Sequence, residues 1–320
     1  MDAPDDLEAP TPGPVPLLHD LAALAAAIDA ERPKRTLQGT LAAADTRRLA
    51  KRLAVALDGR LEDDPRWGRA LRALEALGVV GADFVSRELA LDLGLEHVLA
   101  GSTEDAIDRL IHRLVEPDLH SAVPAVRAAL RQAGEGAVDE VVFLDLLAEQ
   151  HREVLFAPWS GDDGPHYPGE GTPAFDRDAF DKIEAPLLHK LVRRLARLGV
   201  VVCAPGVFAA TADGRRWARA DGPPLPPVWV SSDLEVVVPP DGLTPWERFQ
   251  LERLSRCLAR DVVDRYRLDR EALTGWLRVH TVDEALALLR RRSPALPATA
   301  AETLEGWARS ASRVVLTHGA

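Results

Sequence analysis

Apolar residues recur every three to four positions along much of the chain, which is the spacing of one face of a helix. Leu49, Leu53 and Leu57 show this pattern in its simplest form. Runs of this kind predict helices over residues 17–30, 66–77, 102–114, 121–133, 138–155 and 185–198. Short apolar runs bounded by glycine and proline predict a few strands between the helices. We therefore expect a mainly α protein with small β elements.

The helix expected over residues 185–198 has two distinct faces. Leucines and one valine occupy its inner face, and cationic side chains recur on its outer face at positions i, i+3, i+4 and i+7. This outer stripe consists of Lys190, Arg193, Arg194 and Arg197. Gly199 ends the helix, two strands joined at Pro205-Gly206 follow, and a short helix then carries Arg215 and Arg216.

This order of elements resembles the winged-helix domains of bacterial regulators. The matching residues are Leu198-Gly199-Val200-Val201 after the helix, and Thr211, Gly214, Arg215 and Trp217 after the hairpin. In such domains the helix before the hairpin is the recognition helix. The resemblance implies that the cationic stripe contacts DNA, with Arg215 and Arg216 flanking the wing. A protein-docking face and an ordinary solvated face are the alternatives.

A similar order is expected over residues 34–100. Leu37 and Leu41 are spaced for a first helix, Asp45 is a plausible N-cap for a second, and a third covers residues 66–77. Residues 79–85 fit a short hairpin, so this segment also has the order of a winged-helix module. The middle helix carries four cations that would contact phosphates, or would simply be solvated: Arg47, Arg48, Lys51 and Arg52.

Residues 227–320 begin with strand signals and continue with clear helix start signals. Apolar runs at 228–230 and 234–238 predict one or two strands. Capping boxes, in which a threonine is followed three residues later by a glutamate, begin at Thr244, Thr281 and Thr299. Asp269 is a plausible N-cap for a short helix, and residues 313–316 predict a closing strand. This segment is therefore expected to be an α+β domain.

The same segment resembles the helicase-associated domain related to the N-terminal, damage-recognition-like region of XPB-type DNA helicases. The most specific matching residues are Tyr266-Arg267-Leu268-x-Arg270-Glu271, and Leu304-Glu305-x-Trp307 followed by Arg313-Val314. The resemblance covers about 90 of the 320 residues. It implies a DNA-processing context and names no reaction.

The charge of the chain restricts how it could bind nucleic acid. The net charge is −11, and residues 227–320 contribute nothing to it because they hold equal numbers of cationic and acidic side chains. A field of this sign repels nucleic acid. Any DNA binding must therefore come from a local cationic face or through a partner.

Motifs for enzymatic chemistry are missing from the sequence. It has no G-x-x-x-x-G-K-[ST] loop, which a helicase needs to hold nucleotide phosphates. It also has no G-x-S-x-G, H-E-x-x-H, paired C-x-x-C or G-x-G-x-x-G motif. Cys203 and Cys257 are too far apart to suggest a metal or disulfide framework. With no signal-peptide pattern and no membrane-length apolar run, we expect a cytoplasmic, non-enzymatic protein without cofactor or metal.

Proline-rich stretches suggest four segments along the chain. They are an acidic tail with a packing helix (1–33), a possible winged-helix module (34–100), a helical region ending in a winged helix (101–222) and the helicase-associated domain (227–320). A long loop is expected over residues 157–174, which are rich in proline, glycine and aspartate.

Together these features suggest a DNA-binding or adaptor protein that positions DNA or a helicase partner in repair, replication or defence. One alternative is a protein-interaction subunit of a helicase or nuclease complex with no direct DNA contact. Another is a winged-helix transcriptional regulator. A second candidate patch, Arg290, Arg291 and Arg292, ends a helix, where cations also complement the helix dipole.

Overall fold

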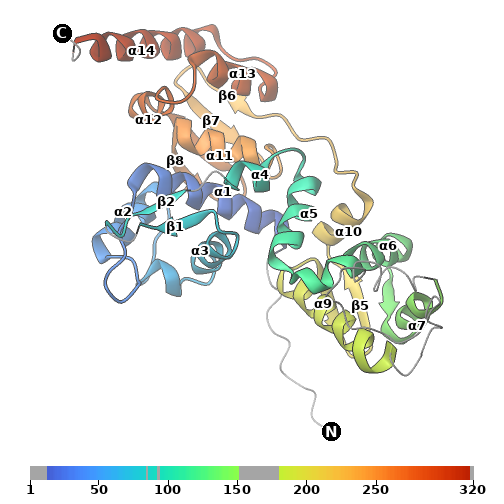
Figure 1. Cartoon of the computed structure of the whole chain (residues 1–320). Helices are drawn as coiled ribbons and strands as arrows, with labels where there is room; N and C mark the ends of the chain where they lie inside the picture. Colours follow the sequence, from blue (N-terminus) through green and yellow to red (C-terminus); the bar gives the residue numbers. More distant parts are fainter. Residues whose placement is uncertain (1–12, 84–85, 92–93, 151–179, 318–320) are drawn as a thin grey trace, which may run out of the picture. The chain divides into compact units, whose positions relative to one another are not determined.

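The computed structural model describes residues 13–83, 86–91, 94–150 and 180–317. The chain divides into two compact units: residues 107–222 with the segment up to Leu17 (unit 1), and residues 18–106 with 223–320 (unit 2). Helices dominate and the strands form small antiparallel sheets (Figure 1), which confirms the expected fold class. Most of the acidic tail and the loop expected at 157–174 lie outside the described residues. Among the residues described, no helix is both long enough and apolar enough to cross a membrane.

Unit 1 combines helices with a three-stranded sheet of order β3-β5-β4. After α5 (Thr103–Leu114), in which the unit boundary falls, its elements are η2 (Pro117–Ala122), α6 (Val123–Ala133), β3 (Ala137–Asp139), α7 (Glu140–Gln150), η4 (Phe180–Glu184), α9 (Ala185–Arg197), β4 (Val201–Ala204), β5 (Val207–Ala210) and α10 (Ala212–Arg219). The helix expected at 185–198 and the hairpin after it are confirmed. Strand β3 was not expected. It occupies the start of the helix predicted from residue 138, because Val138 pairs with Phe208 of β5 and the helix begins only at Glu140.

The N-terminal half of unit 2 also contains helices and a hairpin. Its elements are α1 (Pro14–Glu31, which begins in unit 1), α2 (Ala43–Leu53), η1 (Leu61–Asp63), α3 (Trp67–Ala76), β1 (Val80–Ala82), β2 (Leu89–Leu91) and α4 (Gly94–Leu99). An isolated bridge pairs Lys34 with Glu88, next to the end of the hairpin. A hairpin of β1 and β2 forms, but only β1 lies within the predicted range 79–85, because β2 begins at Leu89.

Two expectations for this half are wrong. Residues around Leu37 form a turn in which the Thr36 amide donates to the Thr40 carbonyl (2.7 Å), so Leu37 is exposed and begins no helix. The first of the helices before the hairpin is α1 instead. Asp45 is not an N-cap, because α2 begins at Ala43. Its carboxylate accepts hydrogen bonds from the Lys34 amide (2.7 Å) and from the Arg48 guanidinium. The first of these bonds attaches the segment that precedes α2 to the helix.

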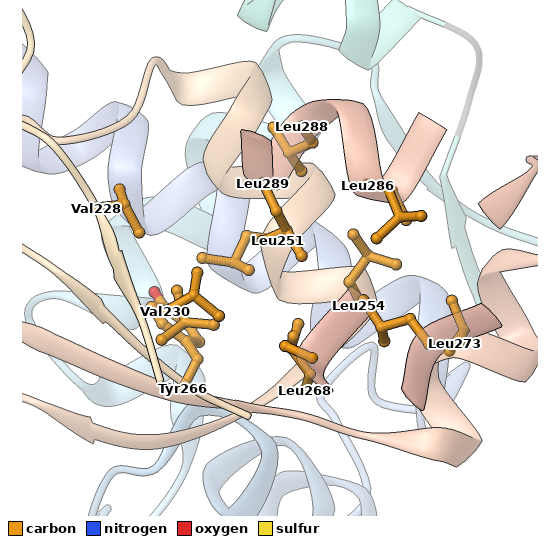
Figure 2. Close-up of a cluster of buried hydrophobic side chains, with 14 of the residues drawn as sticks. Val228, Val230, Leu251, Leu254, Tyr266, Leu268, Leu273, Leu286, Leu288 and Leu289 are labelled. Atoms are coloured by element: carbon orange, nitrogen blue, oxygen red, sulfur yellow. The ribbon is translucent and has the colours of Figure 1, made fainter. Parts of the chain in front are cut away.

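The C-terminal half of unit 2 is an α+β arrangement around a four-stranded sheet of order β6-β7-β9-β8. Its elements are β6 (Trp229–Val230), β7 (Glu235–Val238), α11 (Pro245–Leu254), β8 (Ser255–Arg260), β9 (Asp264–Leu268), α12 (Arg270–Trp276), α13 (Val282–Arg292) and α14 (Ala298–Thr317). Figure 2 shows that apolar side chains of the sheet, such as Val230 and Tyr266, face leucines of α11 and α13. One or two strands were expected at its start, and two form, β6 and β7; the β8–β9 hairpin was not expected.

Side-chain capping fixes three helix starts in this half. Two of the three expected capping boxes form, at Thr244 and Thr281, each with its glutamate three residues later. Asp269 is the expected N-cap of α12 and accepts from two backbone amides. These starts are encoded locally, because a cap needs only its own next three residues.

The end of the chain differs from the prediction in two ways. α14 begins at Ala298, and the Ala301 amide donates to the Pro297 carbonyl (3.2 Å), so Thr299 lies inside the helix and the third capping box is wrong. The closing strand at 313–316 is also wrong, because α14 continues through it to Thr317. Neither glycine nor proline interrupts the sequence between Trp307 and Thr317, so the helix continues despite the strand preference of its two valines.

Helix α1 connects the two halves of unit 2. Nearly every residue from Leu18 to Ile28 is buried, and most of them are alanine or leucine, which allow close approach on every side. Asp20 accepts from Arg66 just before α3, and Asp29 lies 3.0 Å from Arg253 of α11. The packing helix, the 34–100 segment and the C-terminal segment, which the sequence suggested as separate segments, therefore belong to one compact unit.

Candidate nucleic-acid interface

The cationic stripe of α9 lies on one outward face. Lys190, Arg193 and Arg197 are exposed, and Arg194 is half-buried. Arg194 Nη2 lies 2.5 Å from Glu116 Oε1, and Lys190 Nζ lies 3.4 Å from the same oxygen. The hydrogen bond from Arg194 lowers the pKa of the Glu116 carboxyl to about 2. Two of the four cations in the stripe therefore share one carboxylate within the protein, and this pairing leaves one positive charge in excess.

Arg215 and Arg216 are both half-buried on α10. Arg215 Nη1 donates to the Ala210 carbonyl at the end of β5 (2.9 Å). The N-cap Thr211 accepts from the Gly214 amide and fixes the start of the helix that carries both arginines. Arg215 thus holds the end of the hairpin, and this contact limits its reach toward a phosphate.

The four predicted cations of α2 differ in their surroundings. Arg47, Arg48 and Lys51 are exposed. Arg48 bonds to the Asp45 carboxylate and lies 3.5 Å from Glu31. Arg52 is half-buried and donates to the Glu252 carbonyl (3.1 Å), which connects α2 to α11. Only part of this predicted patch is therefore open to an external anion.

Two of the three arginines at the end of α13 are engaged within the protein, and Arg290 is exposed. Arg291 Nε and Arg292 Nε lie 3.2 Å and 2.8 Å from the Glu247 carboxylate. Glu247 is buried and is also the glutamate of the α11 capping box. The two ion pairs therefore compensate a buried charge and attach the end of α13 to the start of α11.

A wide groove in unit 2 gathers cations that the sequence does not place together. Its walls come from the end of α1, from α2, from the α11–β8 junction and from α12, and its volume is about 1270 Å³. The cationic side chains that line it are Arg32, Arg48, Lys51, Arg52, Arg253, Arg256, Arg270 and Arg278. Its acidic side chains are Asp29, Glu31, Asp269 and Glu271. Eight cations against four carboxylates leave a local charge of +4, opposite in sign to the whole chain.

Glu184, directly before α9, is a buried acid whose burial raises its pKa from 4.5 to about 7. Since the folded state keeps the proton longer than the unfolded state, the free energy of unfolding should fall as pH rises from about 4.5 to 7 and level off above that. Glu184→Gln should remove this decline and stabilise the protein above pH 7 by up to about 3 kcal/mol. Urea unfolding between pH 5 and 8 tests this, and parallel pH profiles for the two proteins would contradict it.

The groove was missed because its cations come from distant parts of the sequence. Only Arg48, Lys51 and Arg52 among the predicted site residues line it, and no local motif links them to Arg270 or Arg278. In the part of the chain that the structure describes, no group of three or more His, Cys, Asp or Glu side chains is arranged to hold a metal. No protein-family model matches this sequence, and a search of curated proteins finds no significant match.

Proposed function

We propose that this protein binds DNA through cationic faces of two related modules and positions the DNA, or a helicase or nuclease partner, without catalysing a reaction. The observation that carries the proposal is a repeated order of elements. Among the described elements of unit 1, the order along the chain includes α6, β3, α7, α9, β4 and β5, with η4 before α9, and β3 pairs with β5. In unit 2, α1, the Lys34 bridge, α2, α3, β1 and β2 follow the same order, and Lys34 pairs beside β2.

This order supports a winged-helix assignment for both modules. A winged helix places its third helix before a hairpin, and in DNA-binding examples that helix enters the major groove. In unit 1 the third helix is α9, which carries the cationic stripe. In unit 2 the third helix is α3, and the predicted cations lie on the second helix, α2, instead. The two modules would therefore present different helices to DNA.

The proposal is tested by fluorescence anisotropy of the full-length protein with a labelled duplex across a salt titration. We expect micromolar or tighter binding at low salt, and a log–log salt slope of about −3 to −6, because several phosphates are neutralised. Arg193→Glu should weaken binding at least about tenfold, since Arg193 is exposed on the outward face of α9. Arg131→Glu is the matched control in the same unit, because Arg131 is also exposed on a helix, α6.

A protein-docking adaptor is the second candidate, favoured by one observation. Glu116 pairs with both Lys190 and Arg194, so the α9 face combines cations with a carboxylate, as protein interfaces often do. Absence of duplex binding by the unaltered protein even at low salt would exclude the DNA proposal and leave this candidate.

A further inference from the structure

We infer that the groove of unit 2 is a binding site for the phosphate backbone of duplex DNA. This inference rests on the proposed function and gives it a location. Helices α2 and α12 both contact β8 and lie at the same edge of unit 2 (Figure 1). Together with the ends of α1 and α11, they line the groove.

Internal ion pairs account for only part of the charge in the groove. Arg253 lies 3.0 Å from Asp29, Arg48 lies 3.5 Å from Glu31, and Arg256 lies 3.7 Å from Asp269. Arg52 is engaged with the Glu252 carbonyl.

Four exposed cations remain, and within the described chain none of them forms an ion pair: Arg32, Lys51, Arg270 and Arg278. They come from the ends of α1 and α2 and from the two ends of α12. Several cations without ion pairs in one groove suit the repeated negative charges of a nucleic-acid backbone.

The size and the lining of the groove favour a polymer over a small anion. A volume of about 1270 Å³ exceeds the roughly 300–1,000 Å³ of ordinary small-molecule pockets. Its cations come from four segments of the chain.

The lining also favours duplex DNA over a single strand. Single-strand sites stack bases on exposed aromatic rings. The aromatic residue in the groove, Trp276, is only 2 % exposed, and its ring stacks on His280 at 4.0 Å. Contacts here would therefore be made to phosphates without reading bases, so the groove should bind duplexes with little dependence on sequence.

A purely structural role for these cations has to be separated from binding. Lys51 lies in the last turn of α2 and Arg278 follows the end of α12, where cations complement the helix dipole. Arg270 is different, because it is the first residue of α12 and a cation there opposes the dipole. Arg270→Gln should therefore not destabilise the fold, and any loss of binding it causes must come from the groove.

The test compares two triple variants in the same salt titration. Lys51→Gln/Arg270→Gln/Arg278→Gln removes groove cations. Arg113→Gln/Arg131→Gln/Arg219→Gln removes exposed cations from the last turns of α5, α6 and α10 in unit 1. Each variant changes the net charge by −3, from −11 to −14, so that the long-range field is matched. The melting temperature of each is measured first.

We expect the groove variant to lower the magnitude of the salt slope by about 2–3 and to weaken duplex binding at least about tenfold. The control variant should bind like the unaltered protein, and Arg270→Gln alone should lower the slope by about 1. If the unaltered protein binds duplex DNA but both triple variants bind equally well, the groove inference is wrong and the α9 site remains. Tighter binding of single strands that the groove variant abolishes would overturn the duplex assignment. If the unaltered protein binds no DNA, the proposed function itself fails.

Discussion

Glu252→Ala is expected to destabilise the protein by about 3–5 kcal/mol, because it leaves a buried guanidinium without its counter-charge. Glu252 is 5 % exposed, and its Oε1 accepts from Arg260 Nη2 at 2.7 Å and from Tyr266 Oη at 2.8 Å. Burial raises the pKa of the Tyr266 hydroxyl well above its usual value, so it stays a donor. Arg248 reaches the same hydroxyl (3.0 Å) and the Asp264 carboxylate.

Urea unfolding at neutral pH measures this effect. Glu235→Ala is the matched control from the same sheet, because Glu235 also accepts from an arginine, Arg265, at 2.6 Å, but that pair is exposed to solvent. We expect little change for the control, since solvent screens a surface ion pair. Equal losses in the two variants would contradict the role of burial.

A double variant separates the charge from the packing. Glu252→Met/Arg260→Met removes both buried charges and keeps two long apolar side chains, so it should recover much of the stability lost in Glu252→Ala. Failure to recover would point instead to the other contacts of Arg260. One of these is the hydrogen bond from its Nε to the Leu53 carbonyl at the end of α2 (2.9 Å).

That last contact relates the buried network to the groove. Arg260 holds the end of α2, and Arg52 of α2 donates to the Glu252 carbonyl (3.1 Å). The wall of the groove that α2 forms is therefore attached to the C-terminal half of unit 2 through Arg260 and the backbone of Glu252. A loss of Glu252 should consequently loosen the wall that carries Lys51.

Features encoded within a few residues could be predicted from the sequence. The capping boxes at Thr244 and Thr281 and the N-cap at Asp269 depend on side chains that reach only their own helix start. The stripe of α9 and the hairpin after it follow from a regular 3.6-residue period and a tight turn. Local sequence is sufficient to predict the caps and the α9 stripe with its hairpin, because none of them depends on contacts with distant residues.

Features decided by distant partners were missed or mistaken. Strand β3 is three residues long and exists through its pairing with β5, about seventy positions later. In the β8–β9 hairpin, buried Cys257 and Tyr266 alternate with exposed arginines. This alternation is typical of strands, but arginine is so common along the chain that the pattern did not stand apart from the helical segments. The groove depends on four segments, and the pairing of Arg194 with Glu116 could not be read from the period of α9.

Gly214→Ala is expected to destabilise the protein by about 2–4 kcal/mol, although alanine is normally the better helix former. Gly214 is buried in the first turn of α10, and a Cβ at this position would overlap the carbonyl oxygen of Val200. The overlap is with backbone, which cannot rotate away. The backbone on both sides is also held, because Thr211 Oγ1 donates to the Gly199 carbonyl (2.7 Å) and accepts from the Gly214 amide (3.0 Å).

Gly275→Ala provides the matched control, and it should change stability in the opposite direction. Gly275 lies within α12, and nothing comes within 4 Å of a Cβ built on it. Alanine there should stabilise the protein by about 0.5–1 kcal/mol, because it reduces the conformational freedom of the unfolded chain without a steric cost. Thermal or urea unfolding of the two variants gives the signs directly. A stabilised Gly214→Ala would mean that α10 does not approach Val200 so closely, and that glycine is not required at the junction between the hairpin and the last helix of unit 1.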